Sequence, residues 1–152
     1  SRHKAWLRIH LPSGGVLAYP DIRIDDSDQI SYLGINLLAD TVWQLGHQQA
    51  TGERDSTTLL ATVALGGDYA RVRTDARVVG QGATTKQIAL YYADGHQMHD
   101  FRTLQDHIAP KTNSDLLFKG AVADTAHASV ENSLRLLGMD ELGWKKIDRH
   151  AA

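Results

Sequence analysis

Three of the eight histidines lie close together in the sequence and are the first candidates for chemistry. His96, His99 and His107 occupy one short stretch, and Asp100 lies among them. Neutral imidazole is a common ligand of zinc and iron, often with a carboxylate beside it. The spacing argues against one site, because residues three apart on a strand point to opposite faces, and the zinc motif HExxH is absent. We therefore expect surface or corner histidines, with a metal site as the weak alternative.

Carboxylates are the second candidates, because glycosidases use a pair of them as acid and base. Asp106, Asp115 and Asp124 occupy similar points of successive segments and could line one face. Their spacing of nine residues does not match the longer repeat described below, which argues against stacking. The three aspartates within residues 25–28 are typical of a polar turn. A small β-solenoid hydrolase or lyase acting on polysaccharide is thus the alternative function, with no catalytic pair singled out.

The remaining catalytic signatures are absent from the sequence. There is no cysteine, which excludes disulfides, thiolate metal sites and a cysteine nucleophile within these residues. The GxSxG elbow, the Walker loop GxxxxGK[ST] and the GxGxxG fingerprint are missing. A cupin-like barrel would need two histidines two apart and a glutamate soon after, and the chain has neither. We expect no catalytic residue, no cofactor-binding residue and no enzyme.

The composition is that of one ordinary globular domain. The chain has 152 residues, of which 42% are apolar and 22% charged, and its formal charge is −2. That balance argues against a general nucleic-acid binder and against a polybasic membrane anchor. No apolar run approaches the roughly 20 residues of a membrane span. The chain starts with Ser-Arg-His-Lys, without Met or an apolar signal core, so we expect a cytoplasmic protein that belongs to something longer.

Residues 55–125 divide into five units of about fourteen residues, similar in layout rather than in identity. Each unit opens with polar residues or glycine and continues with a strand-like run. Regular short strands at a near-constant spacing predict an all-β fold built of stacked coils, a β-solenoid.

Within these units, alternation predicts which side chains face inward. In residues 68–82, Ala70, Val72, Thr74, Ala76 and Val78 share one face, and the arginines at 71, 73 and 77 share the other. A solvated charged face is the simplest interpretation of these arginines, and a phosphate or partner site is the alternative. The same logic places Ile88, Leu90 and Tyr92 inward, and groups Leu59, Ala61, Val63 and Leu65 on one inward face.

The last part of the sequence changes character. From residue 129 it is rich in Leu, Glu, Lys and Arg, and Val130, Leu134 and Leu137 follow helical spacing. We therefore predict a β-helix domain over residues 1–128, best supported over 41–128, and a short helical cap over 129–152. A cap is expected because the last coil of a solenoid would otherwise expose a sheet edge.

Four sequence blocks resemble the SufB/SufD family, the paired scaffold subunits of the SUF iron–sulfur cluster assembly system. The blocks are LGGDYAR at 65–71, LYYADGHQMHD at 90–100, TLQDH at 103–107 and SDLLFKGAVAD at 114–124. The resemblance covers residues 41–130 and favours the D-type subunit or an undifferentiated member. It implies a right-handed parallel β-helix flanked by helical regions.

The resemblance also implies a function. Members are non-enzymatic scaffolds, in which a B-type and a D-type subunit pair through their β-helices and each binds an ABC-type ATPase, SufC. An iron–sulfur cluster is held only transiently, in the assembled complex. Members are usually more than twice as long, and the Cys and the His or Glu considered important for assembly have no counterpart here. We accordingly expect no cofactor in this chain, SufB/SufD-type and SufC-type partners, and self-association when the partner is absent.

Overall fold

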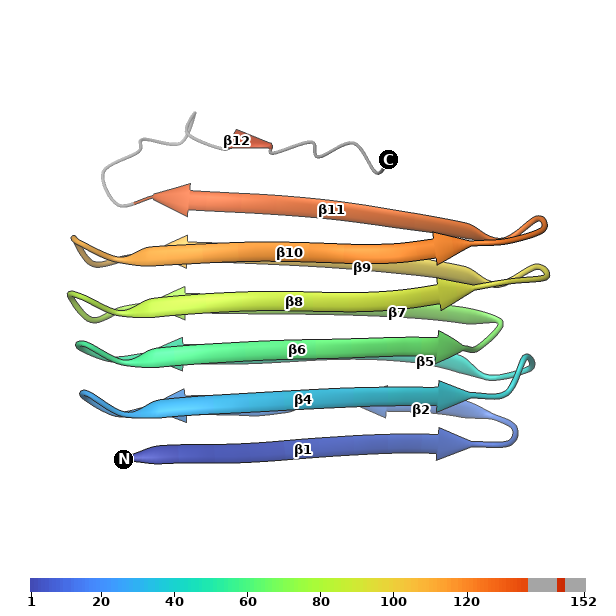
Figure 1. Ribbon diagram of the computed structural model, residues 1–152, viewed down its shortest axis with the longest axis horizontal. Helices are drawn as coiled ribbons and strands as arrows, with labels where there is room; N and C mark the ends of the chain where they lie inside the picture. The colour runs from blue at the N-terminus through green and yellow to red at the C-terminus, as the bar shows by residue number, and fades with distance from the viewer. Residues whose placement is uncertain (137–144, 147–152) are drawn as a thin grey trace.

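The computed structural model describes residues 1–136 and 145–146, and these form two sheets of mainly parallel strands. One sheet has the order β1-β4-β6-β8-β10; the other has the order β12-β11-β9-β7-β5-β2, with β3 also pairing with β5. The chain winds between them as a flattened parallel β-solenoid (Figure 1). The strands are β1 (Arg2–Leu11), β2 (Gly15–Ala18), β3 (Asp21–Ile24), β4 (Gln29–Leu38), β5 (Trp43–Gly52), β6 (Thr57–Gly66), β7 (Tyr69–Val78), β8 (Thr84–Ala93), β9 (Met98–His107), β10 (Asn113–Val122), β11 (His127–Leu136) and β12 (Lys145–Lys146).

The predicted all-β solenoid is confirmed, but its coil is twice as long as the sequence unit suggested. Thr57 pairs with Thr84 in the first sheet, and Tyr69 pairs with Met98 in the second, so the chain returns to the same sheet after 27 and 29 residues. Each unit of about fourteen residues is one strand and one turn, and consecutive units lie on opposite sheets. The described residues contain no helix, and hence none that could span a membrane.

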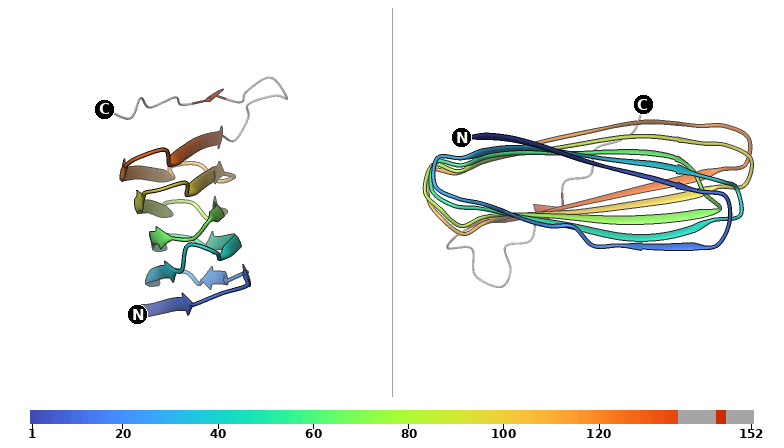
Figure 2. Two further views of the ribbon diagram at one scale, coloured as in Figure 1. Left: turned by 90° about the vertical axis from the view of Figure 1, so that its right-hand side faces the viewer. Right: turned by 90° about the horizontal axis from the view of Figure 1, so that it is seen from below.

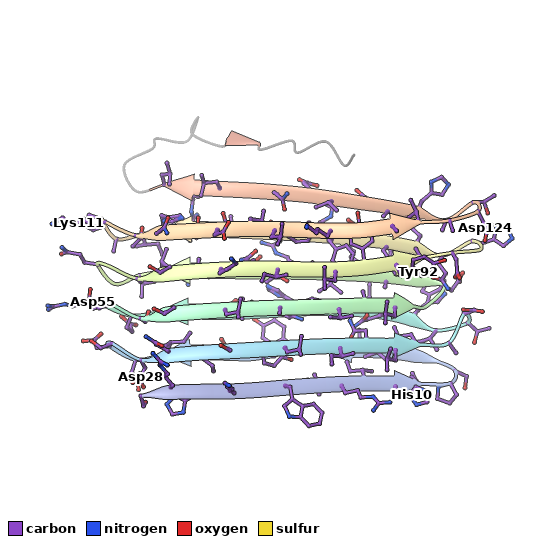
Figure 3. The ribbon with its side chains drawn as sticks, viewed as in Figure 1. His10, Asp28, Asp55, Tyr92, Lys111 and Asp124 are labelled. Carbon is purple, nitrogen blue, oxygen red and sulfur yellow. The ribbon has the colours of Figure 1, made fainter. Side chains whose placement is uncertain are left out.

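The turns at one end of the solenoid share a left-handed backbone conformation. Ser27, Asp55, Gly82 and Lys111 all have positive φ, between 54° and 79°. Asp55 and Lys111 lie at the same end of the molecule, whereas Asp124 marks the opposite end (Figure 3). At Gly82 glycine is required twice over, because its φ is +79° and a Cβ there would lie 2.1 Å from Oδ1 of Asp55.

The interior between the sheets is narrow, so the inward rows contain many small and medium-sized side chains, chiefly Ala, Thr and Val. The prediction for β7 is confirmed, since Val72 and Val78 are each 2% exposed. The predicted inward faces of β6 and β8 are wrong. Leu90 and Tyr92 are each 45% exposed, and Ile88 is only partly buried. The buried residues of the inward rows of these two strands are Thr58, Leu60, Thr62, Ala64, Thr85, Gln87, Ala89 and Ala93, and partly buried Tyr91 belongs to the same row of β8.

One aromatic cluster lies in this interior. Phe101 lies 5.2 Å from Tyr91 and 6.0 Å from Phe118, measured between ring centroids. Gly120 pairs with Tyr91 across the sheet, and a Cβ at Gly120 would come within 2.2 Å of the Tyr91 ring. The glycine in the block SDLLFKGAVAD is therefore explained by packing: it makes room for a tyrosine of the preceding coil.

The predicted helical cap is wrong where the structure describes it. Residues 127–136 form β11, which pairs in parallel with β9, and β12 pairs antiparallel with β11. The stacking of β11 on β9 outweighs the helical spacing of Val130 and Leu134, because every residue from His127 to Leu136 pairs with a residue of the preceding coil, a contact that an isolated helix would not make. The predicted helix beyond residue 136 otherwise lies outside the described residues.

The inward and outward rows of β8 can be tested with one pair of variants. Ala89→Asp would bury a charge at a site that is 2% exposed, and should lower the free energy of unfolding by several kcal/mol. Leu90→Asp changes the next residue, which is 45% exposed, and should cost less than about 1 kcal/mol. Urea unfolding of both variants checks this, and equal shifts of the midpoint would contradict the register of β8.

Candidate interaction surfaces

The structure separates the three candidate histidines. His96 is exposed in the turn between β8 and β9, with Nδ1 2.7 Å from Oγ1 of Thr125. His99 is completely buried, and its Nε2 donates to the carbonyl of Gly66 at 3.0 Å. His107 ends β9, where Thr112 and Ser114 hold its two ring nitrogens at 2.6 and 2.9 Å.

These contacts give each histidine its own environment. Burial lowers the pKa of His99, against the hydrogen bond to Gly66 that raises it. Burial also lowers the pKa of His107, and the charge of nearby Asp106 opposes this. Across residues 1–136 and 145–146, no group of three or more His, Cys, Asp or Glu side chains could hold a metal ion.

The carboxylates of the alternative hydrolase do not line one face. Asp106 lies in β9 on the outer surface of its sheet, with 1% of the residue exposed. Asp115 lies in β10 of the other sheet and pairs with Lys86 at 3.0 Å. Asp124 lies in a turn, where Oδ2 accepts from the backbone N–H of Gly95 at 3.2 Å. The polar turn at residues 25–28 is confirmed, since the backbone N–H of Asp28 donates to the carbonyl of Asp25 at 3.1 Å.

Ion pairs cover the outer surface of the sheet that contains β7, β9 and β11. We call this surface the arginine face. Each of its buried carboxylates is held by two basic side chains. Asp100 lies 3.4 Å from Nε of Arg71 and 3.3 Å from Nε of Arg102. Asp75 likewise accepts from Nε of Arg73 at 2.8 Å and lies 3.1 Å from Nε2 of His47. The arginines of the face are Arg71, Arg73, Arg77, Arg102 and Arg135.

Asp106 is the most deeply buried carboxylate of this face. It accepts from Nε of Arg135 at 2.7 Å and also contacts Nη2 of that residue, and Nε of Arg77 lies 3.6 Å away. The hydrogen bond to Asp106 raises the pKa of Arg135. The Asp106 side chain is 2% exposed, whereas those of Arg77 and Arg135 are 44% and 49% exposed. The acids therefore lie underneath, and solvent meets the guanidinium groups.

The opposite sheet presents an apolar outer surface, which we call the apolar face. Its side chains lie in register on neighbouring strands: Ile35 pairs with Val63, and Val63 with Leu90. Val63 and Leu90 are among the residues that alternation alone placed inside. The composition of the other row of each strand could have corrected this prediction, because its Thr, Ala and Gln side chains suit a narrow interior. The face comprises Leu33, Ile35, Leu37, Leu59, Ala61, Val63, Leu65, Ile88, Leu90, Tyr92 and Leu117.

The pairing around Asp106 predicts an asymmetry between two sets of variants. Removing the charge with Asp106→Asn leaves two half-exposed arginines that water can solvate, at a cost of about 1–2 kcal/mol of unfolding free energy. The double variant Arg77→Gln/Arg135→Gln leaves a buried carboxylate uncompensated, at a cost of about 3–5 kcal/mol. The control Arg54→Gln breaks an exposed pair with Asp55 and should cost below about 1 kcal/mol. Denaturant unfolding gives all three values, and the reverse order would contradict this assignment.

The buried histidines predict how stability depends on pH. Since burial lowers the pKa of His99, the unfolded chain takes up a proton before the folded chain does as the pH falls. The free energy of unfolding should thus be constant above about pH 7 and decrease as the pH falls below about 6.5. His107 contributes with the same sign. The variant His99→Gln should show a smaller decrease between about pH 7 and pH 5, by urea unfolding at each pH; an unchanged decrease would exclude this role of His99.

Comparisons with known proteins agree with the family resemblance of these sequence blocks. Residues 16–135 match the family model described as "SUF system FeS cluster assembly, SufBD core domain". The iron–sulfur cluster assembly SufBD family protein Rv1462 of Mycobacterium tuberculosis is 31% identical over 110 residues, which cover 72% of this chain and 28% of that protein. The family protein ML0594 of Mycobacterium leprae is 30% identical over 113 residues, which cover 74% of this chain and 29% of that protein.

The match therefore spans less than a third of the length of these relatives. No solved structure matches the chain with significance. The family match nevertheless extends over most of the solenoid, from β2 to the end of β11. The chain belongs to the SufBD family of iron–sulfur cluster assembly proteins.

Proposed function

We propose that this chain is a non-enzymatic, cytoplasmic scaffold component of SUF iron–sulfur cluster assembly. It acts through contacts with a related β-helix subunit, as a D-type member, and with an ABC-type ATPase subunit. Family membership supports a role in iron–sulfur cluster assembly, and one observation supports a role through protein–protein contacts. The apolar face is a set of neighbouring Leu, Ile, Val and Tyr side chains that are partly or largely exposed, which is the chemistry of a protein contact rather than of catalysis.

The size of the apolar face supports this proposal. Strands β4, β6, β8 and β10 lie side by side, and with a strand spacing of about 4.8 Å their apolar centre covers roughly 300 Å² in projection. The largest exposed patches of monomeric proteins are about 300–600 Å² and are often functional. Trp6 on β1 is 72% exposed and extends the patch on one side, while Lys86 and Lys119 give it polar neighbours. An apolar centre with a polar rim is the anatomy of a specific interface.

The face lies on the flank of the solenoid, not at either of its ends (Figure 2). A partner can therefore reach it whatever number of coils precedes or follows these residues. We propose that the partner is the related β-helix subunit, because its own sheets can pack face to face on this one at the usual separation of about 10 Å.

A cluster is part of this proposal only as cargo. Iron–sulfur clusters are held chiefly by cysteine thiolates, and these 152 residues contain none. We propose that the cluster is bound transiently in the assembled complex by groups that lie outside this sequence, and that this chain carries no cofactor of its own.

The contact can be tested by purifying the chain together with a SufB-type subunit and a SufC-type ATPase. Leu90→Lys places a charge on the apolar face, beside Val63, and should weaken association by about tenfold or more. The control Met98→Lys adds the same charge to a residue of the opposite sheet that is 42% exposed, and should leave association unchanged. The affinities come from calorimetry. No binding by the wild-type chain, or equal binding by Leu90→Lys, would reject the proposed surface.

A further inference from the structure

We propose that the arginine face, with a hollow beside it, binds an acidic segment of a partner protein that carries an apolar anchor side chain. This inference goes beyond the proposed scaffold contact, since it concerns the other wall of the solenoid and a partner of different chemistry. The two sheets form opposite sides of the flattened coil (Figure 2). Both faces can consequently be occupied at the same time.

The hollow lies where β2 and its following residues approach β5 and β7. It has a volume of about 320 Å³ and is lined by Leu17, Tyr19, Leu45 and His47, with Arg71 and Arg73 along one side. Leu17 is 84% exposed and Leu45 49%, so the lining offers apolar surface directly to solvent.

The wall of the hollow is held in place by polar contacts. The rings of Tyr19 and His47 meet edge to face with their centroids 4.9 Å apart. The hydroxyl of Tyr19 lies 3.4 Å from Oε1 of Gln49, and His47 is fixed by Asp75 at 3.1 Å. The hollow is thus a preformed apolar seat, large enough for a leucine or phenylalanine side chain.

The charges beside this seat are arranged to accept a carboxylate. The ion pairs of Arg71, Arg73 and Arg77 are made through Nε, on the stem side of the guanidinium. The described residues place no hydrogen bond on the Nη groups of Arg71 and Arg73, which are the groups that form bidentate pairs with carboxylates. The side chains of Arg71 and Arg73 are 44% and 53% exposed, against 7% for Asp100 and 10% for Asp75.

Asp100 and Asp75 each have a second partner, which lowers the free-energy cost of turning Arg71 or Arg73 toward an external carboxylate. Asp100 keeps Arg102 when Arg71 turns to an external carboxylate, and Asp75 keeps His47 when Arg73 does so. Asp100 therefore keeps a charged partner, and Asp75 keeps its hydrogen bond to His47, which adds a positive charge only when the imidazole is protonated. These retained contacts reduce the usual penalty for breaking a buried ion pair.

The charge balance favours an acidic protein segment over a nucleic acid. Strands β7, β9 and β11 carry five arginines against four carboxylates, while the chain as a whole carries −2. This small local excess of positive charge is enough to bind a few carboxylates. It is too small for a polyanion, whose binding needs a large excess of cationic side chains. A phosphate backbone also has no apolar group to fill the hollow beside Arg71 and Arg73.

The test uses the complete chain and a fluorescent peptide with the repeat Glu-Glu-Leu, followed by anisotropy. We expect saturable binding at about 0.1 M salt that weakens at about 1 M salt, where charges are screened beyond about 3 Å. Peptides with Lys in place of Glu, or with Ser in place of Leu, and a short DNA duplex serve as comparison probes. Arg71→Gln and Arg73→Gln should each weaken binding about fivefold to tenfold, whereas Arg54→Gln, an exposed arginine in a distant turn, should not.

Leu45→Ser tests the hollow without removing an ion pair, so the proposal remains testable if the arginine variants unfold. It should lower the affinity for the Glu-Glu-Leu peptide to that of the peptide without leucine. Circular dichroism and thermal melting establish that each variant is folded. The inference is overturned if the wild-type chain does not bind the peptide, if it binds the lysine peptide or the duplex as tightly, or if folded Arg71→Gln, Arg73→Gln and Leu45→Ser all keep wild-type affinity. Leu90→Lys should bind the peptide normally, which separates this result from the test of the apolar face.

Discussion

The space between the two sheets is narrow, and the stacking of parallel strands in register decides which side chain enters it at every level. Small residues such as Ala64, Ala70 and Ala89 line much of this space, and larger side chains such as Tyr32, Leu60 and Phe101 are buried among them. Where a large ring is present, a neighbour must be small, as Gly120 is beside Tyr91. Bulky aliphatic side chains that do not fit inside must therefore lie outside.

This constraint accounts for the unusual distribution of apolar residues. In most antiparallel sheets the apolar row faces the core and the polar row faces water. Here β6 and β8 put Thr and Gln inside and Leu and Val outside. Some of these buried polar groups bond to each other, as Thr62 does with Gln48 at 3.2 Å and Thr103 with Asn132 at 2.7 Å, whereas the side chains of Thr85 and Gln87 make no hydrogen bond within the described residues. The apolar face is the consequence of a core that has room for only part of the large apolar side chains of these strands.

Parallel stacking in register also turns single residues into extended surfaces. Because each strand lies directly beside the strand of the next coil, a residue type repeated at one position becomes a row across the sheet. The row of Ile35, Val63 and Leu90 arises in this way on one wall, and the pairing of Arg77 with Asp106 and of Asp106 with Arg135 on the other. A solenoid can thus present two broad faces of different chemistry, which suits a protein that works by holding others together.

Sequence alone determined the fold class and the family, because both depend on local signals. Polar and glycine turns at regular spacing define short strands, and the blocks around residues 65–71 and 114–124 carry the family resemblance. In β7 the outward row is charged, so only the other row could be buried, and the prediction was right.

The candidate surfaces depended on the tertiary structure. In β8 both rows contain apolar residues, and only the alignment of Ala89 beside Thr62 and Phe118 decides that Leu90 faces outward. The pairing of Asp106 with Arg77 and Arg135 joins residues 29 apart on neighbouring coils, a distance that no local pattern encodes. Helical spacing in residues 129–136 likewise yielded to the ladder with β9, since hydrogen bonds to a neighbouring coil depend on what lies beside a segment and not on the segment itself.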